Sequence, residues 1–402
     1  MALLSCSSEG CPIAREGEVA PRPIRLTRLT CPTRPTGLTG LTRPSRGHHD
    51  HDNDDDYDYD DENEHVREMG RYMNGTRADL RAPQPLWRFL STYGLLLLAI
   101  AIECVIFEAV ARYRGMPPFL SARSLVHVLN QSAVYGVLSV GMTFVILTAG
   151  IDLSVGSLVA FGGVICALVV RAGGEPVWAW ILIGWAAALL AGGVAGSLTG
   201  LLVTRVAVPP FIATLALMSS LRGLGYIFAG GQPISPLPDA YTVLGRYRIG
   251  GAVPIAVLVM LAVFVLGALV LNATRFGSHV RAIGGNEEAA RLSGVNVSRT
   301  KWVVYAMCSM LAVAGGLILS SRLGSGDPKA GLGDELSVIA AVVVGGTSLS
   351  GGRGTIGGTF VGLLVVSVLN SGLNWTGVES FVQQVILGAV ILAAVLLDRF
   401  KR

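Results

Sequence analysis

Residues 253–272 read Val-Pro-Ile-Ala-Val-Leu-Val-Met-Leu-Ala-Val-Phe-Val-Leu-Gly-Ala-Leu-Val-Leu-Asn, twenty residues without a charged side chain. A helix needs about 20 apolar residues to cross a bilayer. Nine more apolar segments lie on either side of this one, at about 93–111, 126–149, 154–171, 177–203, 209–229, 302–321, 335–349, 354–372 and 379–397. The sequence therefore predicts an all-α membrane protein, a polytopic bundle of about ten transmembrane helices. The segments 154–171 and 335–349 are short, so either is a candidate for a re-entrant or broken helix.

Residues 1–88 differ from this pattern and predict a disordered N-terminal tail. The tail is first rich in Pro, Thr and Arg, and residues 48–65 consist entirely of Asp, His, Glu, Asn and Tyr. Such a charged run repels itself and has little apolar surface to bury. Its His and Asp could bind metal loosely, but a solvated tail is the simpler interpretation and no metal site is predicted. The first 30 residues lack the apolar core of a signal peptide. Translation starting at Met69 or Met73 is a further hypothesis. Residues 89–402 form the predicted transmembrane domain.

A polar loop at 273–301 interrupts the apolar segments, and its centre reads Gly284-Gly-Asn-Glu-Glu-Ala-Ala-Arg-Leu-Ser-Gly294. Asn286 is a suitable N-cap, and Glu287 and Glu288 are favourable near the positive end of a helix. Gly294 is a suitable stop. These residues predict a helix of two turns. Composition leaves two interpretations open: the helix inserts into a groove on another protein, or it lies on the bilayer surface.

The distribution of basic residues predicts the orientation of the spans. With a cytoplasmic N-terminus, thirteen Lys and Arg side chains near the membrane lie inside and eight lie outside. Cytoplasmic loops carry the excess of basic residues. Both termini are therefore predicted to be cytoplasmic, and so is the loop 273–301, because six spans precede it.

A weak internal repeat links two parts of the chain. The stretches 150–156 and 346–352 share the pattern G-x-x-L-S-x-G, and Gly162 and Gly358 keep the same offset. Transporters often carry repeats with broken helices near the substrate path. Chance matching in a glycine-rich chain is the alternative.

The stretch 284–297 closely resembles the coupling loop of ABC-importer permeases of the ribose, galactose, xylose and arabinose branch. The resemblance covers about residues 90–398 and includes 146–157, 321–327, 339–354 and 383–388 in the same order. The tail has no counterpart. The resemblance implies a plasma-membrane permease subunit of an ATP-driven importer for a monosaccharide or the sugar-like autoinducer-2 signal.

The resemblance also implies the partners and the contact residues. The partners are a cytoplasmic ATPase, an extracytoplasmic sugar-binding protein, and a second permease copy in a homodimer or heterodimer; no nucleic acid is expected. Carried over residue by residue, the short helix is a cytoplasmic coupling helix whose ATPase contacts are Glu287, Glu288, Ala289, Ala290, Arg291 and Gly294.

The chain lacks the sequence that would bind ATP. A Walker A loop requires Gly-x-x-x-x-Gly-Lys-Ser/Thr, and the three lysines follow Thr300, Pro328 and Phe400. ATP hydrolysis is therefore expected on a separate chain, with no catalytic residue and no cofactor here. The six cysteines show no metal-ligand spacing and are expected to be free thiols.

Polar residues inside the apolar segments are the candidates for a substrate path. A charge at mid-membrane costs about 2.5–3.5 kcal/mol, so such groups usually line a cavity or pair. Neutral amides suit a sugar, and the predicted path residues are Asn130, Gln131, Asp152, Asn370, Asn374 and Gln383. Hydrogen bonding between helices is the alternative for each amide, and Asp152 is also expected to cap the segment that it begins.

An ion-coupled secondary transporter of a small polar solute is the alternative function. Such a transporter would require buried acids in mid-span, and only Asp152 lies near such a position. A membrane scaffold without transport is a third class.

Overall fold

The computed structural model describes the backbone of residues 86–400, and side chains from 93 to 393 and at 396. The tail predicted over 1–88 lies outside these residues, except that the first helix already begins at Leu86. Within the described range, eight helices are long and apolar enough to span a membrane. They are α2 (Leu86–Tyr113), α3 (Ala122–Leu147), α4 (Val155–Ala172), α5 (Val177–Thr204), α6 (Pro210–Ala229), α8 (Ile255–Ala273), α11 (Val297–Leu323) and α13 (Ile356–Trp375).

Two further helices occupy the remaining apolar segments. They are α12 (Asp334–Val344) and α14 (Ser380–Phe400). Each of the ten segments seen in the sequence therefore contains one helix, and the prediction of an all-α polytopic membrane protein is confirmed.

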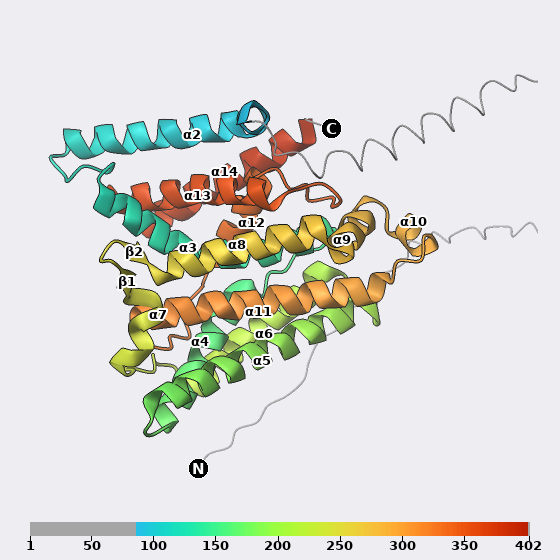
Figure 1. Ribbon diagram of the computed structural model, residues 1–402, viewed down its shortest axis with the longest axis horizontal. Helices are drawn as coiled ribbons and strands as arrows, with labels where there is room; N and C mark the ends of the chain where they lie inside the picture. The colour runs from blue at the N-terminus through green and yellow to red at the C-terminus, as the bar shows by residue number, and fades with distance from the viewer. Residues whose placement is uncertain (1–85, 401–402) are drawn as a thin grey trace, which may run out of the picture. The chain divides into compact units, whose positions relative to one another are not determined.

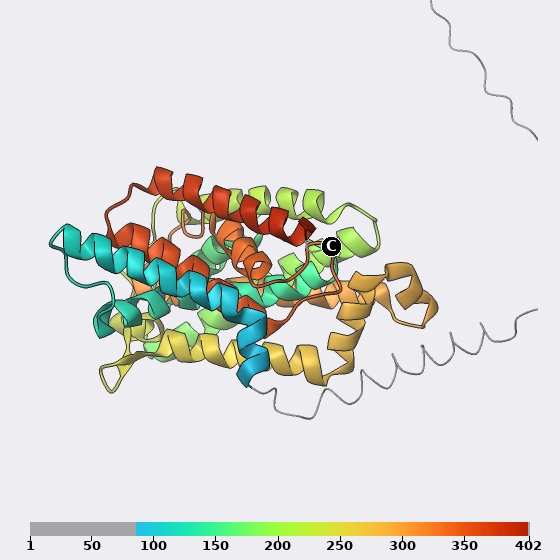
Figure 2. The ribbon, with the colours of Figure 1, turned by 90° about the horizontal axis from the view of Figure 1, so that it is seen from above.

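The long helices run along one common direction, so the bundle has two ends (Figure 1). One end carries α9 (Arg275–Gly285) and α10 (Glu287–Leu292), and is called here the α10 end. The opposite, hairpin end carries η1 (Asp239–Thr242), α7 (Val243–Arg246) and the strands β1 (Arg248–Ile249) and β2 (Val253–Pro254). The two strands pair antiparallel, with Ile249 opposite Val253. Figure 2 shows α14 and α6 along one edge of the bundle and α8 along the opposite edge.

The helix α12 is too short to cross the membrane. Its eleven residues rise about 16 Å, roughly half of a hydrocarbon core about 30 Å thick. Residues 345–355 continue without helix to the α10 end, where the amide of Gly352 donates to the carbonyl of Leu147 at 3.0 Å. The apolar segment 335–349 therefore contains a broken helix, which is one of the two possibilities that its short length predicted. The other short segment forms α4, which is continuous over eighteen residues.

The second copy of the weak repeat contacts the end of α3, just before the first copy. The loop between α3 and α4 holds the first copy, and the loop between α12 and α13 holds the second. Besides the Gly352–Leu147 bond, the hydroxyls of Thr143 and Thr359 hydrogen-bond at 2.9 Å. The surroundings of the matched glycines differ, since Gly162 faces Val313 whereas Gly358 faces the backbone of Gly345.

The core is centred on α11, which packs against α3, α4 and α5. Three glycines, at every fourth position of α5, form its contact with α11. A β-carbon at Gly192 would lie 2.6 Å from Val313 Cγ2, and one at Gly200 would lie 2.8 Å from Trp302 Cα. Between them, a β-carbon at Gly196 would lie 2.6 Å from the carbonyl oxygen of Tyr305. Small residues at this spacing let helix backbones approach closely, so α5 and α11 form a tight antiparallel pair.

Candidate functional site

The polar loop folds as its residues predicted. The side-chain oxygen of Asn286 accepts a hydrogen bond from the amide of Ala289 at 3.0 Å and caps α10. At the other end, Gly294 has φ +84°, a backbone conformation that glycine adopts without strain. The predicted cap and stop are both confirmed.

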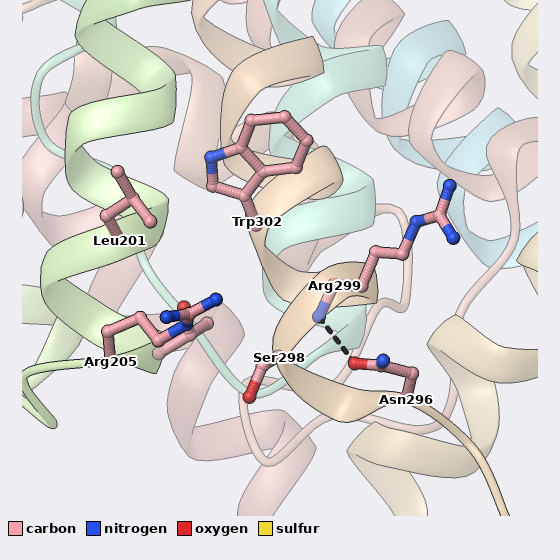
Figure 3. Close-up of a pocket in the computed structure, with 7 residues that line it drawn as sticks. Leu201, Arg205, Asn296, Ser298, Arg299 and Trp302 are labelled. Atoms are coloured by element: carbon pink, nitrogen blue, oxygen red, sulfur yellow. Dashed lines mark hydrogen bonds between the residues drawn. The ribbon is translucent and has the colours of Figure 1, made fainter.

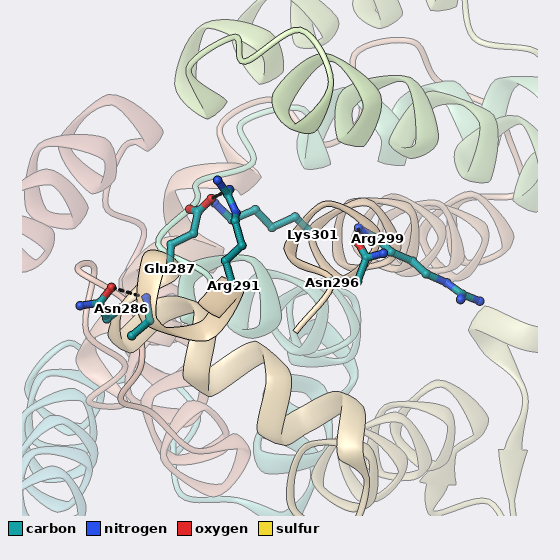
Figure 4. A network of polar contacts seen from close by, with 7 residues as sticks. Asn286, Glu287, Arg291, Asn296, Arg299 and Lys301 are labelled. Carbon is teal, nitrogen blue, oxygen red and sulfur yellow. Dashed lines mark hydrogen bonds and ion pairs between the residues drawn. The ribbon is translucent and has the colours of Figure 1, made fainter. Parts of the chain in front are cut away.

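One face of α10 is held by the protein itself (Figure 4). Ala290 is buried and packs with Ile283 and Val297. The carboxylate of Glu287 pairs with Lys301 Nζ at 2.6 Å and with Arg291 Nη2 at 3.1 Å. Among the coupling residues expected from the resemblance, Glu287 and Ala290 therefore make contacts that fix the helix on the bundle.

The other face of α10 is open. Glu288, Ala289, Arg291 and Gly294 are all exposed. Leu292, four residues after Glu288 on the same face, is 84 % exposed. The sequence analysis did not select Leu292, although it is the only large apolar side chain between Gly284 and Gly294. An exposed leucine flanked by charged residues makes this face suitable for insertion into a groove on a partner.

Gly284, near the end of α9 and just before α10, lies against the end of α3 and the loop that follows α12. A β-carbon at Gly284 would collide with the carbonyl oxygen of Leu147 and the amide nitrogen of Gly352. Leu147 ends α3, and Gly352 lies in the loop that follows α12. The end of α9, next to α10, therefore lies directly against the backbone at the end of α3 and in the loop after α12.

A polar cavity of about 610 Å³ lies toward the hairpin end. Side chains of α3, α12, α13 and α14 line it, and they include four of the six predicted path residues: Gln131, Asn370, Asn374 and Gln383. Gln383 Nε2 donates to Asn374 Oδ1 at 3.0 Å and to the carbonyl of Val378 at 2.7 Å. The volume lies within the range of about 300–1,000 Å³ that is usual for small-molecule pockets.

Charged groups gather beside this cavity. Asp334 and Glu335 line it, and a smaller cavity of about 220 Å³ shares Asp334 and adds Arg322 and Lys329. Asp334 is the first residue of α12. The cavity therefore combines neutral amides with a charged edge.

Two predicted path residues lie elsewhere. Asn130 does not line this cavity, and its carbonyl accepts a hydrogen bond from Arg322 Nη1 at 3.3 Å. Asp152 is fully buried in the loop between α3 and α4, at the α10 end. It accepts bonds from the amide and hydroxyl of Ser154 at 2.9 and 2.6 Å. The expectation that Asp152 caps the helix is wrong, because the N-cap position belongs to Ser154.

The model of one protein family matches residues 124–395, from α3 to α14. Its description is "Branched-chain amino acid transport system / permease component". The chain belongs to this permease family.

Curated relatives of the permease carry more specific names. The ribose import permease protein of Bacillus subtilis is 46% identical over 288 residues, which are 71% of this chain and 87% of the relative. The ribose import permease protein of Escherichia coli K12 is 45% identical over 71% of this chain and 88% of its own length. The L-arabinose permease protein of Azospirillum brasilense is 33% identical over 81% and 92%. No solved structure shows a significant match to the permease.

Proposed function

We propose that this permease is the membrane subunit of an ATP-driven importer for a monosaccharide. The observation that carries the proposal is the 46% identity to a ribose permease over most of that protein's length. The family description mentions branched-chain amino acids, but the relatives described above are named as ribose import permeases or as an L-arabinose ABC transporter permease. The ion-coupled alternative receives no support from these relatives.

The proposed partner at the α10 end is a cytoplasmic ATPase. The open face of α10, with Glu288 and Leu292, would occupy a groove on that chain. The α10 end would then face the cytoplasm, with both termini on that side of the plasma membrane, in agreement with the positive-inside count. The hairpin end would receive sugar from a binding protein, and a second permease copy would complete the pathway.

The proposed sugar path passes through the polar cavity near the hairpin end. Amide side chains both donate and accept hydrogen bonds, so they match the hydroxyl groups of a neutral sugar. Gln131, Asn370, Asn374 and Gln383 supply four such groups from three helices.

Uptake of labelled ribose into proteoliposomes is expected when the permease is combined with its ATPase and binding protein. L-arabinose and L-leucine serve as competing solutes. Uptake should require internal ATP and should persist when ionophores collapse the ion gradients, because ATP drives the cycle. Leucine uptake without sugar uptake, or transport that stops with the gradients, would contradict the proposal.

The Gln383→Leu substitution is expected to lower sugar uptake about tenfold, because a hydrogen bond to an uncharged group contributes about 0.5–1.5 kcal/mol and Gln383 also orients Asn374. Gln232→Leu is the matched control, since Gln232 is an exposed amide beyond the end of α6 and does not line the cavity. Co-purification of the ATPase verifies assembly of each variant. Unchanged uptake by the Gln383 variant would remove this residue from the proposed path.

A further inference from the structure

Two adjoining cavities lie between α5 and α11, away from the polar cavity described above. The first, of about 400 Å³, opens at the α10 end between the last turn of α5 and the first turn of α11. The second, of about 500 Å³, continues along the same helices toward the middle of the bundle. Leu201 lines both, so together they form one elongated site.

The first cavity is basic and polar. It is lined by Arg205 and Arg299, by the hydroxyl side chains of Thr204 and Ser298, and by Trp302. In Figure 3 the Arg205 side chain lies near Ser298 between the two helices, and the Trp302 indole lies above them. The Arg299 side chain extends to the other side of α11. Within residues 93–393, neither guanidinium group forms a hydrogen bond or an ion pair.

The second cavity is apolar. Its lining includes Leu190, Val194 and Leu198 of α5 and Met310 of α11. The three α5 side chains are 70, 62 and 49 % exposed, whereas the glycine face of the same helix is filled by α11. A long apolar chain could lie against this surface without displacing any part of the bundle.

A ligand that fits the whole site must be anionic at one end and apolar over its remaining length. Trp is enriched at membrane–water interfaces, and basic pockets between transmembrane helices are suited to anionic lipid head groups. A free phosphate ion would occupy only the basic cavity and would leave the apolar part uncovered. The charges and the continuity of the two cavities therefore favour a phospholipid.

We propose that this site binds one anionic glycerophospholipid of the leaflet at the α10 end. Its phosphate lies beside Arg205 and Ser298, and one acyl chain lies along Leu190, Val194 and Leu198. Arg299 reaches the phosphate only after its side chain turns back across α11. The proposal requires that the helices span a bilayer and is independent of the transported solute.

The test compares lipid retention by the purified full-length protein, using native mass spectrometry after incubation with equal amounts of phosphatidylglycerol and phosphatidylcholine. The unmodified protein is expected to retain phosphatidylglycerol about tenfold or more over phosphatidylcholine, since each basic residue near the surface favours anionic lipid. The double variant Arg205→Ala/Arg299→Ala should lose this preference. Arg275→Ala is the matched control, because Arg275 is an exposed arginine at the same end, outside the cavity.

A second pair of variants tests the apolar part of the site. A β-carbon at Gly193 would lie 3.6 Å from Met310, an ordinary contact, so Gly193→Ala should retain lipid normally. Gly193→Phe should fill the groove and lower the retention of both lipids. This pair keeps the test valid if the double arginine variant is poorly folded.

Three results would overturn the proposal. Equal retention of the two lipids by the unmodified protein would exclude recognition of an anionic head group. Displacement of the lipid preference by millimolar inorganic phosphate alone would identify a free-anion site. Loss of ATPase co-purification or of the permease dimer in the double variant, with lipid retention unchanged, would assign the cavity to a protein partner.

Discussion

Gly284→Ala is expected to abolish sugar uptake and to lower the thermal stability of the permease. The added methyl group would collide with the carbonyl oxygen of Leu147 and the amide nitrogen of Gly352, and both are backbone atoms. Neither can rotate away as a side-chain end could. Overpacking of this kind costs about 1–3 kcal/mol or more, and here it also disturbs the close approach of α9 to the end of α3 and to the loop after α12. Uptake in proteoliposomes and a thermal melt of the purified protein measure the two effects.

The adjacent residue supplies the matched control. A β-carbon at Gly285 would meet no heavy atom within 4 Å. Gly285→Ala removes the same hydrogen from the same helix, so it is expected to remain near wild type in uptake and melting. Equal behaviour of the two variants would contradict the assigned role of Gly284.

Leu292→Asp is expected to abolish ATPase association while leaving membrane insertion intact. The side chain is 84 % exposed in the isolated permease, and its burial in a partner groove would contribute about 1.5–3 kcal/mol. Loss of that contribution lowers affinity by about 10–150-fold, and the carboxylate adds a desolvation cost. Co-purification of the tagged ATPase from membranes measures the loss. Glu288→Lys, on the same face, should act in the same direction.

Tyr113→Asp is the matched control, because it also replaces an exposed, largely apolar side chain by an acidic one, but at the hairpin end of the bundle. Tyr113 ends α2 and is 92 % exposed, and ATPase association should be unaffected by this change. Normal co-purification of the ATPase with the Leu292→Asp variant would contradict the proposal that the open face of α10 binds the ATPase. The interpretation of α10 as a helix lying on the bilayer surface would then be preferred.

The helical architecture could be predicted because each span carries its own signal. An apolar run such as 253–272 needs no tertiary partner to be recognised, and the structure places α8 (Ile255–Ala273) there. The short helix α10 was equally accessible, since Asn286 and Gly294 act on their immediate neighbours. In both cases the residues of the segment itself were sufficient to predict the helix.

The assembly of the candidate site could be predicted only in part. Asn370 and Asn374 are four residues apart on one helix, so their common face follows from helical geometry. Their proximity to Gln131, more than two hundred residues earlier, depends on how α3 packs against α13. Asp152 illustrates the reverse case: it is polar and close to a span like the others, but the fold places it at the opposite end. The end of α12 at Val344 could not be located from the sequence, in which the segment 335–349 is only an unusually short apolar run.

The tight contact between α5 and α11 also determines which parts of the permease can move. Glycine at positions 192, 196 and 200 contributes no side chain to this contact, and the backbone of α5 fits closely against α11. We therefore expect α5 and α11 to move together as one rigid unit of the subunit. In a rearrangement that opened the molecule first to one side and then to the other, we expect the remaining helices to move relative to α5 and α11.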